Sequence, residues 1–311
     1  LRYGGPVGEN GAYRVYAKYF QRDDAVFDSG QDANDGWLSA RGGARFDWNW
    51  GDTRATVQGD IYGTDTSQSY SVPMLRFPYV RNSGEGTYLS GGNVLVRWAR
   101  TFSDDSELSL QTYYDRSESN FLPIRENRDT LDFELQHRLA ARERHEVIWG
   151  VGFRYIDNRS DGREVMSMAP EGQRKRLFSA FLQNRISLTD ELTLTLGSKL
   201  EHNDFTGFEV QPSVRVAWAP NSRHTMWGAV SRAVRTPSIF EETGRVLILS
   251  VPFVGAGFYG NSRFESEELL SFELGYRVRA SDNLSLDLAL YLNRYDNLRT
   301  LELGLPFLEF S

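Results

Sequence analysis

The sequence predicts an all-β protein, an antiparallel transmembrane β-barrel segment in which about 13 strands can be placed. Three observations predict this class. Apolar and polar residues alternate with a period of two, many of the alternating segments are longer than soluble strands, and the connections between them are short and long in turn.

The alternation is clearest in three leucine-rich segments. Residues 192–200 read Leu-Thr-Leu-Thr-Leu-Gly-Ser-Lys-Leu, and residues 131–139 read Leu-Asp-Phe-Glu-Leu-Gln-His-Arg-Leu. Residues 284–292 place five leucines on one face. Successive side chains of a strand point to opposite faces of its sheet, so each segment has one apolar and one polar face.

The predicted strands follow one another along most of the chain. They lie near residues 12–20, 37–48, 53–62, 87–101, 106–117, 128–140, 145–157, 175–188, 191–203, 208–219, 223–236, 268–280 and 283–296. A soluble strand usually has about 5 or 6 residues, whereas a tilted strand that crosses a bilayer needs about 9 to 11. Many of these segments are therefore long enough to cross a membrane.

The connections carry the third signal. Short ones with turn residues lie near 49–52, 102–105, 141–144, 189–190, 220–222 and 281–282. Most of the others are long, at 21–36, 63–86, 118–127, 158–174 and 237–267. Outer-membrane barrels have this layout, with short periplasmic turns and long external loops. A large soluble β-sandwich or propeller is the alternative, but such folds rarely sustain strands of this length.

The two strand faces differ in the way that a membrane barrel requires. If the apolar face meets lipid, the opposite face is a polar lumen, which can line water or bind a plug but cannot be a dry core. This lumen receives Arg14, Lys18, Arg41, Arg45, Gln58, Asp60, Gln111, Asp115, Asp132, Glu134, Arg138, Lys199, Glu201, Arg215, Glu273, Arg277 and Asp287. Six of the seven tryptophans lie within about five residues of a short turn, which indicates an aromatic girdle at one membrane interface.

Composition argues against several other classes. The chain of 311 residues has no run of about 18 apolar residues, which a transmembrane helix would need. The formal net charge of −7 disfavours a nucleic-acid partner, and the absence of cysteine excludes thiolate metal sites and a cysteine nucleophile. The four histidines are scattered and no nucleotide-binding motif occurs, so we expect neither an enzyme nor a resident cofactor. The acidic stretch 28–35 lacks the spacing of a calcium loop, and no metal site is predicted.

The most specific string is Ser-Arg-Ala-Val-Arg-Thr-Pro-Ser at residues 231–238, where Pro237 ends a predicted strand. Arg232 and Arg235 fall on opposite faces of that strand, and at least one of them should meet carboxylates in the lumen. This string resembles the barrel signature of TonB-dependent outer-membrane receptors.

Other segments carry the same resemblance. Residues 1–18 are similar to the family's exit from the plug into the first barrel strand, and residues 196–201 to a mid-barrel strand. Glu268 and Glu273 match the glutamate-containing strand that follows in the family, although Glu267 stands where the family commonly has proline.

The resemblance covers essentially the whole chain and implies a barrel of about 22 strands with a plugged lumen, in the outer membrane of a Gram-negative bacterium. Such receptors import scarce nutrients, mostly ferric siderophores, and TonB with ExbB and ExbD supplies the energy through a TonB box before the plug. The implied partners are outer-membrane lipid, TonB and a small iron chelate or similar nutrient.

No plug or TonB box is recognisable in the sequence, so residues 1–311 are expected to be one partial barrel domain truncated at both ends. Three alternative functions stay open. They are a passive porin-like channel, an outer-membrane enzyme and a soluble binding module.

Ligand contacts in such receptors come from the plug and the external loops, so the resemblance points to two long loops. A mixture of arginine and aromatic residues suits an anionic ligand that carries aromatic rings. The candidate contacts are Tyr70, Arg76, Phe77, Tyr79 and Arg81 in loop 63–86, and Phe253, Phe258 and Tyr259 in loop 237–267. The alternative is that each loop packs on its own aromatic residues.

Overall fold

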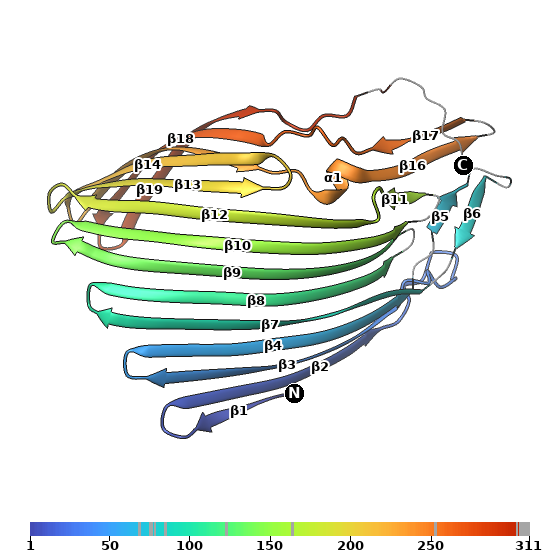
Figure 1. Cartoon of the computed structure of the whole chain (residues 1–311), viewed down its shortest axis with the longest axis horizontal. Helices are drawn as coiled ribbons and strands as arrows, with labels where there is room; N and C mark the ends of the chain where they lie inside the picture. Colours follow the sequence, from blue (N-terminus) through green and yellow to red (C-terminus); the bar gives the residue numbers. More distant parts are fainter. Residues whose placement is uncertain are drawn as a thin grey trace.

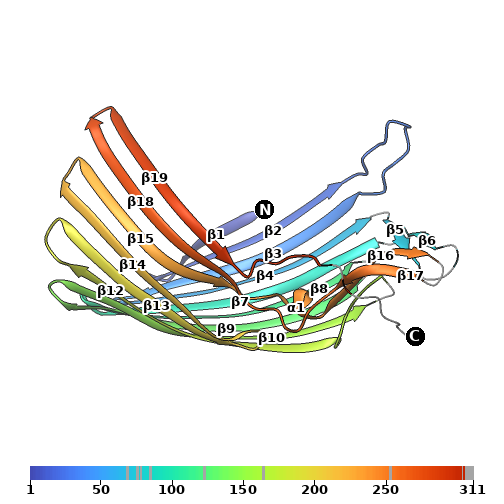
Figure 2. The same ribbon diagram turned by 90° about the horizontal axis from the view of Figure 1, so that it is seen from above.

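The computed structural model describes residues 1–67, 70–74, 77, 79–83, 86–121, 124–162, 165–251, 254–302 and 304. Within them, 14 strands form one antiparallel sheet, with β1 and β19 at its two edges. The strands are β1 (Arg2–Val7), β2 (Gly11–Arg22), β3 (Trp37–Trp50), β4 (Thr53–Ser67), β7 (Gly86–Ser103), β8 (Ser106–Phe121), β9 (Ile124–Arg142), β10 (His145–Gly162), β12 (Gly172–Ser187), β13 (Leu192–Asn203), β14 (Gly207–Asn221), β15 (His224–Arg235), β18 (Glu267–Ser281) and β19 (Leu284–Asp296). The sheet is strongly curved (Figure 1 and Figure 2).

Every strand predicted from the alternation lies in this sheet, and the predicted fold class is confirmed. The additional strand is β1, which pairs with β2 from Arg2 opposite Tyr16 to Val7 opposite Gly11. Its sequence, Arg-Tyr-Gly-Gly-Pro-Val, has no alternation of apolar and polar residues, so the pattern could not detect it.

The two ends of the sheet differ as predicted. Tight turns join the strands at one end, and the glycine of the β3–β4 turn, Gly51, has a φ of +54°, which other residues rarely adopt. The long connections at the opposite end form small elements of their own (Figure 1). These are β5 (Tyr70–Pro73), β6 (Val80–Ser83), β11 (Met166–Met168), α1 (Ile239–Thr243), β16 (Gly244–Val251) and β17 (Val254–Tyr259).

The register places the predicted lumenal residues on one face. Arg14 lies opposite Arg45, and Arg45 lies opposite Gln58. Leucines and valines cover the other face and remain exposed, as in the row of Leu284 to Leu292 on β19. Helix α1 lies on the concave side of the sheet (Figure 2). It packs against the polar face, as shown by the hydrogen bond of 2.7 Å that Gln173 of β12 donates to Thr243 Oγ1. The concave face is therefore the lumen.

Large aromatic rings on the lumenal face lie flat across glycines of the neighbouring strand. In each case ring and glycine are direct cross-strand partners: Tyr16 and Gly43, Tyr62 and Gly91, Phe181 and Gly150, and Trp227 and Gly275. A Cβ atom on any of these glycines would lie less than 3 Å from the ring. Trp227 thus faces the lumen, whereas the other tryptophans near the turns, such as Trp149, lie on the outer face as a girdle requires.

A small apolar cluster lies on the concave face at the loop end. Ile124 of β9, Met168 of β11 and Ile239 of α1 are the buried hydrophobic side chains among the described residues. Within the part of the chain that the structure describes, no helix has the length and apolarity needed to cross a bilayer.

Candidate functional site

The two loops that the sequence nominated for ligand contact lie together. The β5–β6 hairpin belongs to the first loop and the β16–β17 hairpin to the second, and β5 contacts β16. Both hairpins lie at the loop end of the curved sheet, beside β11 (Figure 1). Segments about 170 residues apart in sequence therefore form one surface at the external mouth of the lumen.

The predicted contact residues whose side chains the structure describes on this surface are aromatic, and they are exposed or partly exposed. Phe77 and Tyr79 meet edge to face with ring centroids 6.1 Å apart, and Phe77 is 85% exposed. Phe258 and Tyr259, on β17, are about half exposed. Arg76, Phe253 and the side chains of Tyr70 and Arg81 lie outside the described residues, although the backbone of Tyr70 is in β5 and that of Arg81 in β6.

The end of β15 anchors the second of these loops. The Arg235 guanidinium binds both carboxylate oxygens of Glu267 at 2.8 and 2.9 Å and both oxygens of Glu241 at 2.9 and 3.1 Å. Arg299 donates a further bond of 2.9 Å to Glu241. Pro237 lies between Arg235, the last residue of β15, and the start of α1, and it follows the end of the strand as predicted. Arg235 therefore joins the sheet to the helix that starts the loop.

The side chain of Glu241 is enclosed by this cluster and only 9% exposed. The Arg235 guanidinium, helped by bonds from Ser238, lowers the pKa of the Glu241 carboxyl to about 2. Ser238 and Glu241 also form a capping box at the start of α1. A second ion pair, from Lys175 of β12 to Glu242, fixes the same helix on the lumenal face.

Arg232 has a different role because it lies beside an interruption in the sheet. Strands β14 and β15 pair only from Ser213 opposite Ser231 towards the turn, and Pro212, which has no N–H to donate, stands where pairing ends. Beyond that point the Arg232 guanidinium donates to the backbone carbonyl of Val210 and binds Glu268 at 2.7 Å. The side chain thus bridges two strands that have no backbone ladder there.

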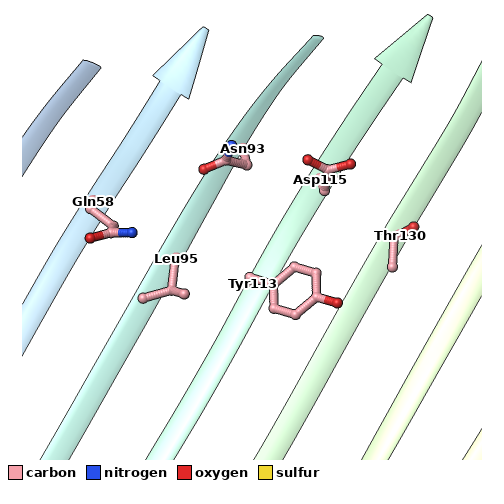
Figure 3. A pocket seen from close by; sticks show the side chains of 6 residues that line it. All are labelled: Gln58, Asn93, Leu95, Tyr113, Asp115 and Thr130. Carbon is pink, nitrogen blue, oxygen red and sulfur yellow. The ribbon is translucent and has the colours of Figure 1, made fainter.

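The lumenal wall carries two shallow hollows. The first has a volume of about 310 Å³ and is lined by Gln58, Asn93, Leu95, Tyr113, Asp115 and Thr130, from four adjacent strands (Figure 3). The second, of about 390 Å³, includes Trp227 and Glu273, the remaining motif residue. Amide, hydroxyl and carboxylate groups in both can hydrogen-bond to water or to a polar protein surface.

The clusters around Arg235 and Lys175 contain residues that the sequence reasoning missed. These are Glu241, Glu242 and Lys175. Lys175 lies 67 residues before Glu242, so the two meet only through the fold. One signal for the helix was available, because Ser238 and Glu241 fit the Ser-x-x-Glu capping pattern directly after Pro237. Among the described residues no group of three acidic or histidine side chains could hold a metal ion.

These features define a segment of an outer-membrane β-barrel receptor. The family model described as "TonB dependent receptor-like, beta-barrel" matches residues 2–308, and the chain belongs to that family. The family places the chain in the Gram-negative outer membrane. It is a family of receptors rather than of enzymes.

Individual relatives agree with this assignment. A ferric enterobactin receptor of Pseudomonas aeruginosa is 27% identical over 153 residues, which are 45% of this chain and 20% of that protein. The ferrienterobactin receptor of Escherichia coli K12 is 23% identical over 128 residues, 38% of this chain and 17% of that protein.

The solved structure of the siderophore receptor PirA from Pseudomonas aeruginosa has a TM-score of 0.71 at 16% identity, over 94% of this chain and 51% of that one. A structure of the ferric enterobactin receptor PfeA from the same species has a TM-score of 0.71 and also 16% identity, over 94% of this chain and 49% of that one. The chain thus spans about half the length of these solved receptors and a smaller part of the curated ones.

Proposed function

We propose that the chain is the barrel part of a receptor that takes up a ferric siderophore, with energy from TonB, ExbB and ExbD. The observation that carries the proposal is the meeting of the β5–β6 and β16–β17 hairpins at the mouth of a barrel of this family. The names of the curated relatives, ferric enterobactin receptors, support an iron chelate as the ligand.

The chemistry of the hairpin surface suits this ligand class. The rings of Phe77 and Tyr79, which meet edge to face, can stack on the aromatic rings of a catecholate chelate. The phenolic hydroxyl of Tyr79 can also form a hydrogen bond. Binding of a negatively charged chelate requires cationic groups, and the sequence of the first loop contains Arg76 and Arg81. The lumenal wall below it is polar and suits passage of a hydrated solute.

Binding is tested with the complete natural protein, purified in detergent, by quenching of its tryptophan fluorescence during titration with a ferric triscatecholate. Replacing both Phe77 and Tyr79 by alanine should weaken binding by about tenfold or more, because each stacked ring contributes about 1 kcal/mol. The control is Phe102→Ala, a residue 56% exposed at the opposite end of the sheet, which should change affinity less than about twofold.

Two results would contradict the proposal. One is unchanged affinity of the double variant, and the other is the absence of any binding of ferric chelates to the wild type. Uptake of radioactive iron chelate by cells with and without TonB separates the receptor from a passive channel, since a channel would continue to admit the chelate without TonB.

A further inference from the structure

The second hollow of the lumenal wall lies over β15, β18 and β19. Its volume of about 390 Å³ is within the range of small-molecule sites, which is about 300–1,000 Å³. Each of the three strands contributes a large side chain to it, and these are Trp227, Glu273 and Tyr291. Two smaller polar residues of the lining satisfy each other, because Ser271 Oγ donates a hydrogen bond of 2.8 Å to Asn293 Oδ1. The chemistry left for a ligand is therefore two aromatic rings and one carboxylate.

The indole ring of Trp227 forms a flat platform on this wall. It lies across Gly275, its direct cross-strand partner, since a Cβ atom on that glycine would lie 2.1 Å from Cε2 and Nε1 of the ring. One face of the ring thus rests on the backbone of β18, and the other face is turned toward the lumen. Among aromatic side chains, an indole face attracts a cation most strongly.

The strand register places the carboxylate between the two rings. Strand β18 lies between β15 and β19, and its Glu273 is the direct cross-strand partner of Tyr291. Such partners have Cβ atoms about 4.5–5.5 Å apart. Glu273 is also two residues from Gly275 on the same face, so it is a diagonal neighbour of Trp227, within reach of a long side chain. The ring of Tyr291 is accessible, because this residue is 77% exposed.

No neighbouring cation balances the charge of Glu273. Among the residues that the structure describes, its side chain takes part in no ion pair or hydrogen bond, whereas Arg277 on the same face is bound to Asp287 at 2.5 Å. Arg215 lies in the same cross-strand row, but Ala229 separates it from Glu273. The hollow therefore combines an unpaired negative charge with two ring faces.

We propose that this hollow binds the guanidinium group of a small organic cation in the lumen. A guanidinium is planar and weakly hydrated, so it can stack on an aromatic ring and donate two parallel N–H bonds to the Glu273 carboxylate. A compact, strongly hydrated ammonium would use the charge but not the flat rings. The hollow lies apart from the β5–β6 and β16–β17 hairpins and needs no iron chelate, so its test is independent of the proposed transport ligand.

The test uses the complete natural protein in detergent and two probes of the same shape, methylguanidinium and N-methylurea, of which only the first is charged. Saturation-transfer NMR on the methyl signal of each probe should show methylguanidinium binding at least about tenfold more tightly, with an affinity that falls as salt is added. Glu273→Gln should remove this preference, and Tyr291→Leu should weaken methylguanidinium binding by about threefold. The control Glu134→Gln removes the same charge from the lumenal face of β9, where the cross-strand partners Gln111 and Gly152 offer no ring, and it should bind as the wild type does.

Four outcomes would overturn the proposal. They are equal affinity of the wild type for both probes, an unchanged preference in Glu273→Gln, an equal loss in Glu134→Gln, and no binding of methylguanidinium to the complete protein. The third would assign the preference to the overall charge of the lumen, and the fourth would show that another part of the protein fills the hollow. The comparison of the two probes on the wild type needs no variant, and migration that shifts on heating shows whether each variant has folded.

Discussion

Gly275 is expected to be one of the least replaceable residues of the lumenal wall. It lies on β18 directly opposite Trp227 of β15, whose indole ring covers it. A Cβ atom at position 275 would lie 2.1 Å from Cε2 and Nε1 of that ring and 2.5 Å from Cζ2. These distances are far below van der Waals contact, so Gly275→Ala must push the indole out of its place against the sheet.

The expected cost follows from overpacking. A methyl group forced into a filled site usually destabilises a protein by about 1–3 kcal/mol, through strained rotamers and shifted backbone. The assay is equilibrium unfolding of the complete natural protein in urea, followed by tryptophan fluorescence and by the heat-dependent gel shift. The variant should unfold at lower urea, with a free energy of unfolding reduced by that amount.

The double variant Trp227→Ala/Gly275→Ala makes the test specific. Removing the ring also removes the clash, so the two losses should be less than additive, with a coupling energy of about 1–2 kcal/mol. Gly228→Ala is the matched control, because it lies next to Trp227 on β15 and its Cβ would meet the nearest atom at an ordinary 3.7 Å. Wild-type stability of Gly275→Ala, or strictly additive losses, would refute the reasoning.

Three further predictions follow from the ion pairs and from the two faces. The depressed pKa of Glu241, about 2 against an ordinary 4.5, contributes roughly 3 kcal/mol that is present above pH 4.5 and lost as pH falls toward 2. Protection of the α1 amides, corrected for the intrinsic pH dependence of hydrogen exchange, should therefore stay constant from pH 7 to about pH 4.5 and fall below it, and a fall in protection already between pH 7 and pH 5 would disprove this. Because the chain has no cysteine, Thr130→Cys should react with a membrane-impermeant thiol reagent through the lumen. Phe133→Cys, in the apolar row of the outer face with Phe153 and Phe178, should react only with an apolar reagent, and equal reactivity would contradict the assigned faces. Arg232→Gln should lower the urea midpoint by an amount equivalent to about 1–3 kcal/mol, since the Val210 carbonyl and Glu268 lose a charged donor. An unchanged midpoint would show that the contacts of Arg232 across β14 and β15 are dispensable.

The sequence predicted correctly those strands in which apolar residues facing lipid alternate with polar residues facing the lumen. Residues 131–139 and 284–292 are of this kind, and each lies in a long strand with its leucines on the outer face. The pattern failed for β1, whose glycines and proline carry no alternation. It also failed for the hairpins of the long loops, whose short strands need neither an apolar stripe nor a fixed length.

The site was less predictable than the fold for a physical reason. Phe77 and Phe258 could be nominated by residue type. The contact between their two loops, however, depends on how the β5–β6 and β16–β17 hairpins fold back, which no local pattern encodes. The partners of Arg235 were hidden in the same way. Glu241 is six residues away in α1, and Glu267 is 32 residues away on β18. The position of α1 and the pairing of β15 with β18 bring both to Arg235.

The hydrogen bonds of Arg235 also indicate that this motif residue is not part of the ligand surface. Its Nε, Nη1 and Nη2 atoms already make four hydrogen bonds to two carboxylates, and an anionic ligand would have to displace Glu241 or Glu267 to reach the guanidinium. A motif whose charge is satisfied within the protein can serve receptors for different ligands, because it fixes the loop to the barrel and leaves recognition to the hairpins. Loss of Arg235 should therefore disturb the position of α1 before it changes any preference among ligands.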